Sequence, residues 1–307
     1  MLERAPRQSL RVSQIGCIAA RALRDGAAGE VRSIFERSLY LTVDQQWICV
    51  GPAGLGMGPL NALCESWDAN NPSTKWIGVG DRVAIHERTA LVGHALAIEF
   101  AGAAEWSPEG PGSWTAASVV SGLSALAAAL PDVLPAEGLA LLLRPQSPAF
   151  PPPVVATAQP AASYLADLVR VTVPQQTFRQ IDPSLLAPLL GLGPGLTPSG
   201  DDFVGGGLIA LDILGLTESR DQIWSAIAPL ARTSTNDVSY AHLSAAADGQ
   251  GSAAVHALLN DVMTGQNGQM AERIASVAAI GHTSGWDASA GAVTVLRAYC
   301  AVSTCPR

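Results

Sequence analysis

The segment GLGPGLTPSGDDFVGGG, residues 191–207, combines residue types that handle charge in enzymes. Seven of its seventeen residues are glycine, and it ends on an apolar run that is typical of a helix. A glycine-rich turn that opens on a helix can bind an anion, because several backbone N–H groups point outward and the helix dipole adds to them. The candidate anion-binding residues of this turn are Gly193, Gly195, Thr197, Ser199 and Gly200.

Two adjacent carboxylates, Asp201 and Asp202, follow these glycines and would repel a bare anion. A divalent metal ion resolves this conflict, because Mg²⁺ bridges carboxylates and substrate phosphate oxygens. Asp201 and Asp202 would then be its ligands. Alternatively, the carboxylates accept hydrogen bonds from a neutral amide or hydroxyl, while Thr197, Ser199 and the backbone hold the anion. The residues leave both resolutions open. They exclude a Walker loop, because no GK[ST] follows, and a dinucleotide fingerprint, because no clear strand precedes.

The pattern S-G-x-D-x-x-x-G occurs twice, at residues 199–206 and 284–291. In each copy we expect the Ser to be the N-cap of a helix, with Asp three residues on, as in a capping box. Helix capping would explain the pattern in both copies, with the last glycine of each copy allowing a neighbouring helix to approach. Capping does not explain the additional glycines before the first copy or the second aspartate within it. In the functional interpretation Ser284, Gly285 and Asp287 form the far wall of the site, and His282 is an acid–base or anion-binding group.

Other polar residues are weaker candidates. The hydroxyls of Thr235 and Ser239 could reach the site, although an ordinary N-cap at Thr235 is the favoured interpretation. In the first half of the chain, Arg37, Arg82 and Arg88 are the nearest basic candidates for an anionic substrate. The glycine-rich residues 51–63 predict a turn between strands or, alternatively, a loop that closes over a ligand. No G-x-S-x-G elbow occurs, which argues against nucleophilic covalent catalysis.

Composition limits the classes of partner. The chain has 307 residues, which suits one large domain or two moderate ones, and 48% of them are hydrophobic. The net charge of −8 predicts that nucleic acid is not a partner, because an acidic surface repels phosphate backbones. A small anionic substrate must therefore meet a local positive site.

The cysteines and the apolar runs predict a cytoplasmic protein. There are five cysteines and no CxxC, which favours reduced thiols and argues against a zinc site. The first twenty residues lack a continuous apolar stretch, so we expect no signal peptide. The longest apolar runs, residues 116–130 and 204–216, are short for a membrane span.

The patterns along the chain predict a fold of the α/β class, α+β type. Strands are expected at residues 38–43, 47–51, 76–80, 82–87, 94–100 and 139–145. Helices are expected at residues 11–28, 113–130 with Ser113 as N-cap, 160–171, 183–190, 199–214, 218–231, 235–248, 252–264, 270–280 and 284–302.

These elements predict two units. A β-rich N-terminal unit, residues 1–144, is expected to pack against a mainly helical C-terminal unit, residues 161–307. The proline-rich residues 145–160 predict a linker or loop, because proline disrupts ladders and helices. We expect the ligand between the units, at the helix N-termini Ser199 and Ser284.

The motifs together resemble the AllH-type family, many of whose members are known only as a domain of unknown function. The specific part is L-T-P-S-G-D-D within the stretch from Gly193 to Phe203; residues 281–287, with G-H-T-S-G-W-D, and the pair Thr235 and Ser239 support it. In the first half, residues 37–39, 55–59 and 79–80 agree. The resemblance covers roughly residues 35–302.

The resemblance implies a role in oxamate carbamoyltransferase, an enzyme of anaerobic allantoin breakdown and hence of purine catabolism. Members are associated with two other protein types, one of them FdrA-like. The reaction interconverts oxalurate and phosphate with oxamate and carbamoyl phosphate. These small anions suit a glycine-rich helix N-terminus. Such an enzyme needs positioning and electrostatic stabilisation rather than a protein nucleophile.

The main hypothesis is therefore a subunit of a carbamoyl-transferring enzyme whose catalytic candidates are Asp201, Asp202, His282 and Asp287. One alternative is an independent Mg²⁺-dependent enzyme that acts on a phosphate ester or a nucleotide. The other is a non-catalytic scaffold subunit, whose glycines serve only helix packing.

Overall fold

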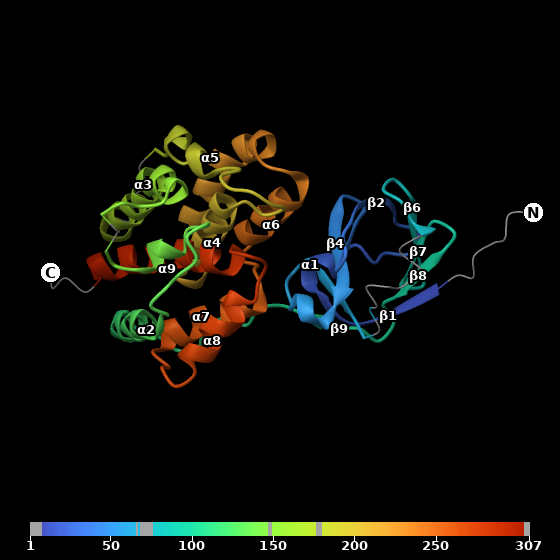
Figure 1. Cartoon of the computed structure of the whole chain (residues 1–307), viewed down its shortest axis with the longest axis horizontal. Coiled ribbons are helices and arrows are strands. Elements are labelled where there is room, and N and C mark those ends of the chain that lie inside the picture. The colour runs from blue at the N-terminus through green and yellow to red at the C-terminus, as the bar shows by residue number, and fades with distance from the viewer. Residues whose placement is uncertain (1–7, 66, 68–75, 147–148, 176–179, 304–307) are drawn as a thin grey trace, which may run out of the picture. The chain divides into compact units, whose positions relative to one another are not determined.

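The chain folds into two compact units, Met1–Ser107 and Pro108–Arg307 (Figure 1). The computed structural model describes residues 8–65, 67, 76–146, 149–175 and 180–303. The first unit consists mainly of strands and the second of helices, which confirms the α+β class. The boundary between the units lies at residues 107 and 108, earlier in the chain than the proline-rich residues 145–160.

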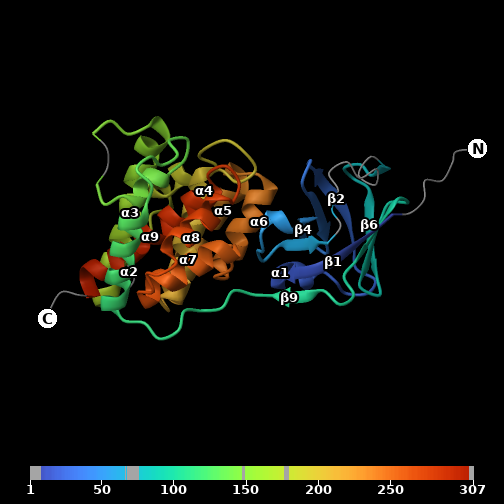
Figure 2. The same ribbon diagram turned by 60° about the horizontal axis from the view of Figure 1, so that its bottom comes forward.

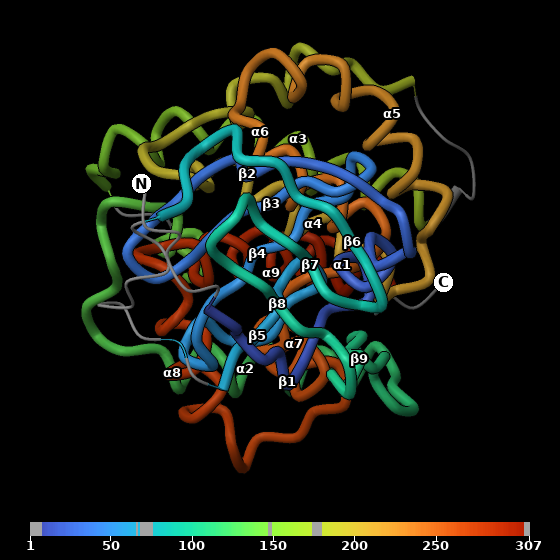
Figure 3. Tube along the Cα trace, turned by 90° about the vertical axis from the view of Figure 1, so that its right-hand side faces the viewer, coloured from blue at the N-terminus to red at the C-terminus, as the bar shows by residue number. Residues whose placement is uncertain are grey.

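The N-terminal unit is a sheet that closes on itself. Its strands are β1 (Gln8–Gly16), β2 (Ala28–Ile34), β3 (Leu39–Val43), β4 (Gln46–Pro52), β5 (Asn61–Cys64), β6 (Arg82–His86), β7 (Thr89–Val92), β8 (Leu96–Glu99) and β9 (Ala104–Trp106). They follow the order β5-β4-β3-β2-β6-β7-β8-β1-β9, and β5 also pairs with β1. The ladder from β5 round to β1 therefore forms a ring, which can be followed in Figure 3, and leaves no free edge among its strands.

The local sequence explains most of this sheet. In β6 exposed and buried residues alternate, as expected for a strand with one face on a core. The β3–β4 hairpin turns at Asp44 and Gln45, and both residues have positive φ angles, 45° and 67°. Two positive φ angles fit a two-residue turn whose twist matches that of the strands. The pairing is mainly antiparallel, although β1–β8, β1–β9 and β4–β5 are parallel.

Two predictions for this unit were wrong. The helix expected at residues 11–28 is replaced by β1 and by the one-turn helix α1 (Cys17–Ala20). Leu10 and Val12 are buried and lie two residues apart, so the period of two prevails once β1 pairs with β5 and β8. No strand forms at residues 76–80, because Gly80, with φ of 89°, belongs to a turn.

The C-terminal unit is built from helices. They are α2 (Ala116–Ala129), α3 (Pro153–Gln175), α4 (Ser199–Ile213), α5 (Thr217–Ser234), α6 (Asp237–Ala247), α7 (Ala253–Thr264), α8 (Met270–Ala278) and α9 (Ser284–Ser303). Helices α4 and α9 pack along each other; α5 and α6 contact α4, while α2, α3, α7 and α8 contact α9 (Figure 2). No helix of the described ranges is long and apolar enough to cross a membrane.

Local corrections also apply to this unit. The N-cap of α2 is Thr115 rather than Ser113, in a capping box with Ser118. Helix α3 begins at Pro153, inside the predicted linker, because proline is tolerated in the first turn of a helix. Two expected elements are short 3₁₀ turns instead: η3 (Ala140–Leu143) replaces a strand, and η4 (Pro183–Leu185) with η5 (Ala187–Leu189) replaces a helix.

The predicted reduced state of the cysteines agrees with the structure as far as it is described. Cys17, Cys49, Cys64 and Cys300 form no disulfide among the described residues. Cys305 lies outside them.

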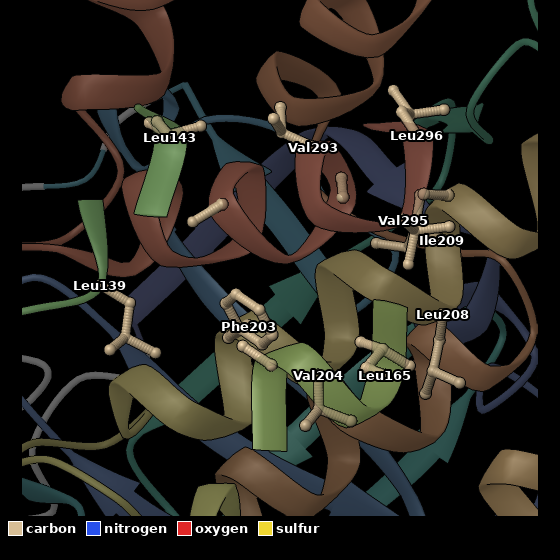
Figure 4. Close-up of a cluster of buried hydrophobic side chains, with 14 of the residues drawn as sticks. Leu139, Leu143, Leu165, Phe203, Val204, Leu208, Ile209, Val293, Val295 and Leu296 are labelled. Carbon is tan, nitrogen blue, oxygen red and sulfur yellow. The ribbon is translucent and has the colours of Figure 1, made fainter. Parts of the chain in front are cut away.

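Glycines bring the backbones of α4 and α9 into direct contact. A Cβ atom on Gly206 would lie 1.8 Å from the carbonyl oxygen of Ala288, and one on Gly291 would lie 1.8 Å from that of Phe203. The phenyl ring of Phe203 is fully buried beside this contact, in the cluster of Figure 4. The last glycine of each S-G-x-D-x-x-x-G copy thus admits the other helix, as the capping interpretation expected.

We predict that Gly206→Ala destabilises the unit by about 1–3 kcal/mol or more, because the helices must separate to admit the methyl group. The neighbouring Gly205→Ala is the matched control, since its Cβ would meet only the Ala246 methyl group at 3.4 Å. Better helix propensity should leave that variant neutral or stabilise it by up to about 1 kcal/mol. Urea unfolding measures both, and equal effects of the two substitutions would contradict the close helix contact.

Candidate functional site

The glycine-rich turn before α4 lies at the surface of the helical unit. Gly193 and Gly195 have φ angles of 108° and 99°, which side chains other than glycine rarely allow. Pro194, Gly195 and Leu196, at the tip of the turn, are exposed to solvent. The turn is therefore open to a ligand rather than packed into the core.

The turn offers unpaired hydrogen-bond donors. Within the described part of the chain, the backbone N–H groups of Gly195, Leu196 and Thr197 donate to no protein acceptor. A Cβ atom on Gly193 would lie 3.0 Å from the backbone nitrogen and 3.2 Å from the Oγ of Ser199. The absence of a side chain at Gly193 lets the turn pass close to Ser199, the first residue of α4, which is itself buried. Free backbone N–H groups in a glycine-rich turn are one kind of group that can bind an anion.

The beginning of α9 lies against this turn. The hydroxyls of Thr197 and Ser284 are 2.8 Å apart, and those of Ser199 and Thr283 are 3.4 Å apart. Gly281, with φ of 56°, repeats the relation of Gly193 to Ser199, because its Cβ would lie 3.2 Å from the Oγ of Ser284. The two helix N-termini therefore converge, as the two sequence copies suggested.

The predicted N-caps were wrong in detail. Pro198 is the N-cap of α4 and makes no side-chain cap bond, whereas Ser199 is the first helical residue. Ser284 is likewise the first residue of α9. The Ser199 hydroxyl contacts that of Thr283, and the Ser284 hydroxyl contacts that of Thr197. Each serine therefore bonds to the turn that precedes the other helix and does not cap its own helix.

Two predicted anion-binding glycines serve packing instead. The N–H of Gly200 donates to the Leu192 carbonyl at 2.9 Å, and the N–H of Gly285 donates to that of Ile280 at 3.3 Å. A Cβ atom on Gly200 would lie 1.9 Å from the Leu189 carbonyl oxygen. These glycines allow close backbone contact, and their N–H groups are not available to a ligand.

The buried side chain of Asp201 links the glycine-rich turn to the beginning of α6 by hydrogen bonds. Its side chain accepts hydrogen bonds from the backbone N–H of Gly191 at 2.8 Å, from the hydroxyl of Ser239 at 2.6 Å and from the hydroxyl of Thr235. Thr235 is therefore not the N-cap of α6; Asn236 takes that role. The hydroxyls of Thr235 and Ser239 thus both bond to Asp201.

Asp202 and Asp287 occupy equivalent places in the two copies and bond crosswise. Burial raises the pKa of Asp202 well above its ordinary value of 3.8, while hydrogen bonds from the Ser284 and Thr197 hydroxyls oppose the shift. Burial also raises the pKa of Asp287, opposed chiefly by the Leu139 N–H, 2.6 Å from Oδ1, and then by the Ser199 hydroxyl. Each aspartate thus bonds the serine of the other copy.

Both of these carboxyl groups keep an unused acceptor. The Oδ2 atoms of Asp202 and Asp287 are buried and have no hydrogen-bond partner. A buried acceptor without a partner costs about 1–3 kcal/mol, so such atoms occur where a function or a bound molecule requires them. The charge of Asp287 raises the pKa of Asp202 further, which favours a proton on Asp202.

The Asp201 carboxylate is already engaged and does not fit the metal-ligand role that the sequence allowed. The oxygens of Asp201 already accept three hydrogen bonds from Gly191, Thr235 and Ser239. The described ranges contain no group of three or more His, Cys, Asp or Glu side chains placed to hold a metal ion. The second resolution, in which neutral groups bond to the carboxyl oxygens, fits the geometry.

The remaining candidates are one histidine of the helical unit and three arginines of the N-terminal unit. The imidazole of His282 is 81% exposed and lies 3.6 Å from the Glu137 carboxylate, a contact too exposed to hold the ring firmly. Arg37, Arg82 and Arg88 belong to the N-terminal unit. The guanidinium of Arg37 contacts the Gly54 carbonyl at 3.4 Å, and the other two residues are exposed.

Sequence reasoning missed three contributors to the site. Asn236 donates its Nδ2–H to the Leu196 carbonyl at 2.9 Å, Thr283 contacts Ser199, and the backbone of Leu139 binds Asp287. Asn236 and Thr283 adjoin recognised motif residues, so local polarity could have pointed to them. The partnership of Leu139 and Asp287 spans about half the chain and leaves no local signal.

We predict that Asp201→Asn destabilises the helical unit by about 1–3 kcal/mol, because an amide cannot accept all three hydrogen bonds and turns its NH₂ group toward a donor. Equilibrium unfolding in urea measures this loss. Asp167→Asn on α3, whose side chain is 64% exposed, is the control and should change stability by less than about 0.5 kcal/mol. An Asp201→Asn variant as stable as this control would contradict the role of the three hydrogen bonds to Asp201 in holding the turn.

We predict that Asp202→Asn gains stability relative to the native chain as pH rises. Above pH 3.8 the unfolded chain loses the Asp202 proton while the folded chain keeps it, so the folded state binds more protons. The unfolding free energy of the native chain therefore falls as pH rises from the Asp202 pKa of the unfolded chain to that of the folded chain. The slope is up to about 1.4 kcal/mol per pH unit. Asparagine cannot ionise and removes this fall.

Unfolding free energies measured from about pH 4 to about pH 8 test the direction of this difference. Asp182→Asn is the control: hydrogen bonds from Ser184 lower the pKa of Asp182, so its pH window lies below 3.8 and its difference from the native chain should be nearly flat over this range. A difference between Asp202→Asn and the native chain that is flat over this range would show that Asp202 titrates as an ordinary carboxyl.

Comparison with known proteins finds one family model that is similar to the part of the chain that carries this site. Residues 189–296 match the model of the family described as oxamate carbamoyltransferase subunit AllH. The matched residues include the turn, Asp201, both S-G-x-D-x-x-x-G copies and Asn236. No curated protein and no solved structure matches the chain. Over these residues the match confirms the resemblance to the AllH-type family that the motifs indicated.

Proposed function

We propose that the chain is a subunit of an oxamate carbamoyltransferase-like enzyme of allantoin and purine catabolism, and that its helical unit binds phosphate or carbamoyl phosphate. The description of the matched family supports the enzyme class. The observation that carries the binding site is the set of unpaired N–H groups at the exposed turn before α4.

The positive field for the anion comes from the backbone. Residues 191–207 and 281–291 contain no Lys or Arg, and the whole chain has a net charge of −8. The N-termini of α4 and α9 each carry about half a positive charge, and they converge at the hydroxyls of Thr197 and Ser284. Two helix dipoles and the free N–H groups together offset the repulsion by the acidic chain.

Asp202 fits beside an anion because its raised pKa favours the neutral carboxyl form. In the proposed reaction a phosphate oxygen bonds to the carbamoyl carbon of oxalurate, and the bond from that carbon to the oxamate nitrogen breaks. The oxamate nitrogen takes up a proton, and the reverse reaction removes it. In this proposal the Asp202 carboxyl holds that proton, and its unpartnered Oδ2 faces the carbamoyl group, while Asp287 holds Ser199 in place.

We propose that the chain works with further subunits. The description of the matched family supports this, because it names a subunit. The resemblance of the motifs implies that one of these partners is FdrA-like. The cytoplasmic location stays a prediction from the sequence.

Calorimetric titration with inorganic phosphate and with carbamoyl phosphate tests the binding site. Gly193→Ala should weaken both affinities about tenfold or more, because its methyl group would crowd the Ser199 N–H at 3.0 Å. Gly215→Ala is the matched control. Gly215 also has a positive φ angle, 74°, but no atom lies within 4 Å of its Cβ position, so it should bind like the native chain.

The alternatives predict other outcomes of the titration. Binding of ATP with Mg²⁺ but not of carbamoyl phosphate would favour an independent nucleotide enzyme and discard the carbamoyl-transfer proposal. Binding of none of these anions, by the chain alone or with its partner subunits, would favour the scaffold. The glycine contacts of Gly206 and Gly291 would then be the whole purpose of the motif.

A further inference from the structure

Asn236 makes two hydrogen bonds that face in different directions. Its Oδ1 accepts the Ser239 N–H at 3.0 Å and so caps α6, whereas its Nδ2 donates to the Leu196 carbonyl at 2.9 Å. Both partners are backbone groups with fixed roles, one a donor and one an acceptor. The orientation of the side-chain amide is therefore determined by its surroundings.

The bond to Leu196 fixes a peptide plane of the turn. The carbonyl of Leu196 and the N–H of Thr197 belong to one planar trans unit, in which they point in opposite directions. Because Asn236 holds the carbonyl toward the beginning of α6, the Thr197 N–H must point away from it. That N–H has no protein acceptor in the described part of the chain.

The α5–α6 junction also holds the start of the same turn. A Cβ atom on Gly191 would lie 2.2 Å from the carbonyl oxygen of Ser234, so the two backbones are in contact. Asp201 joins Gly191 to Thr235 and Ser239. Among the bonds that the structure describes here, the one from Asn236 reaches the exposed tip of the turn at Leu196.

We propose that Asn236 is a positioning residue, which binds the Leu196 carbonyl and thereby aims the Thr197 N–H at the anion. This inference rests on the proposed function for the identity of the anion, and on the hydrogen bonds alone for the orientation of the peptide. It assigns to a helix cap a second role, outside the residues that contact the ligand.

Two substitutions separate the two roles of Asn236. Asn236→Ser and Asn236→Asp both retain an N-cap oxygen, since Ser, Asp and Asn are about equally good caps, but neither donates to Leu196. Asn260→Ser on α7 is the matched control, because Asn260 also donates its Nδ2–H to a loop carbonyl, that of Glu109, at 3.0 Å. The melting temperature, the ¹⁵N order parameters of residues 195–197 and the affinity for inorganic phosphate are measured for each variant.

The inference predicts that both Asn236 variants keep a melting temperature within a few degrees of the native chain. The order parameters of residues 195–197 should fall from about 0.85 toward 0.6 as the peptide plane becomes mobile. Phosphate affinity should fall about three- to tenfold, which corresponds to one neutral hydrogen bond. Asn236→Asp should lose more affinity than Asn236→Ser, because its charge repels the anion. Asn260→Ser should leave the order parameters and the affinity unchanged.

Unchanged order parameters in the Asn236 variants would overturn the inference, and so would mobile residues 195–197 with an undiminished phosphate affinity. A native chain that binds neither phosphate nor carbamoyl phosphate would contradict the proposed function and the anion-facing role together. In that case the order parameters still decide whether Asn236 holds the turn.

Discussion

The direct backbone contact between α4 and α9 is the constraint on which the site depends. Gly206 and Gly291 leave no side chain between the two helices, so the carbonyls of Ala288 and Phe203 can approach them. Helices this close begin side by side, and their first residues, Ser199 and Ser284, meet the turn of the neighbouring helix. Gly206 and Gly291, which allow the helices to pack closely, therefore also bring the positive N-terminal ends of the two helices together.

This convergence explains why acidic residues stand beside a predicted anion site. Asp201 uses its carboxylate to fasten the turn, so its charge is offset by three donors. Asp287 is buried, as is the Oδ2 atom of Asp202, and burial raises the pKa of both carboxyl groups, while hydrogen bonds from the serines of the opposite helix oppose the shift. A neutral carboxyl neither repels a phosphate nor needs a metal ion to stand beside it.

Much of this arrangement could be read from local sequence, and the rest could not. The repeated S-G-x-D-x-x-x-G pattern indicated two related helix beginnings, because glycine and serine at fixed spacing leave a local signal. The caps were misplaced by one residue, since the Ser199 hydroxyl has a partner, Thr283, that is remote in sequence. The helix predicted at residues 11–28 was wrong, because β1 becomes a strand only by pairing with residues some fifty or more positions away. That pairing leaves no signal in the local sequence. The role of Asp201 depends on Ser239, and that contact exists only after the helices pack.

The central claim is that the turn before α4 binds a small phosphate-bearing anion through backbone N–H groups. The most direct measurement is a crystal structure of the chain grown with phosphate or carbamoyl phosphate. The account predicts an oxyanion within about 3 Å of the backbone nitrogens of Thr197 and Ser199, and close to the Ser284 hydroxyl. An empty turn whose N–H groups bond to the protein instead, or an anion bound only elsewhere, would contradict it.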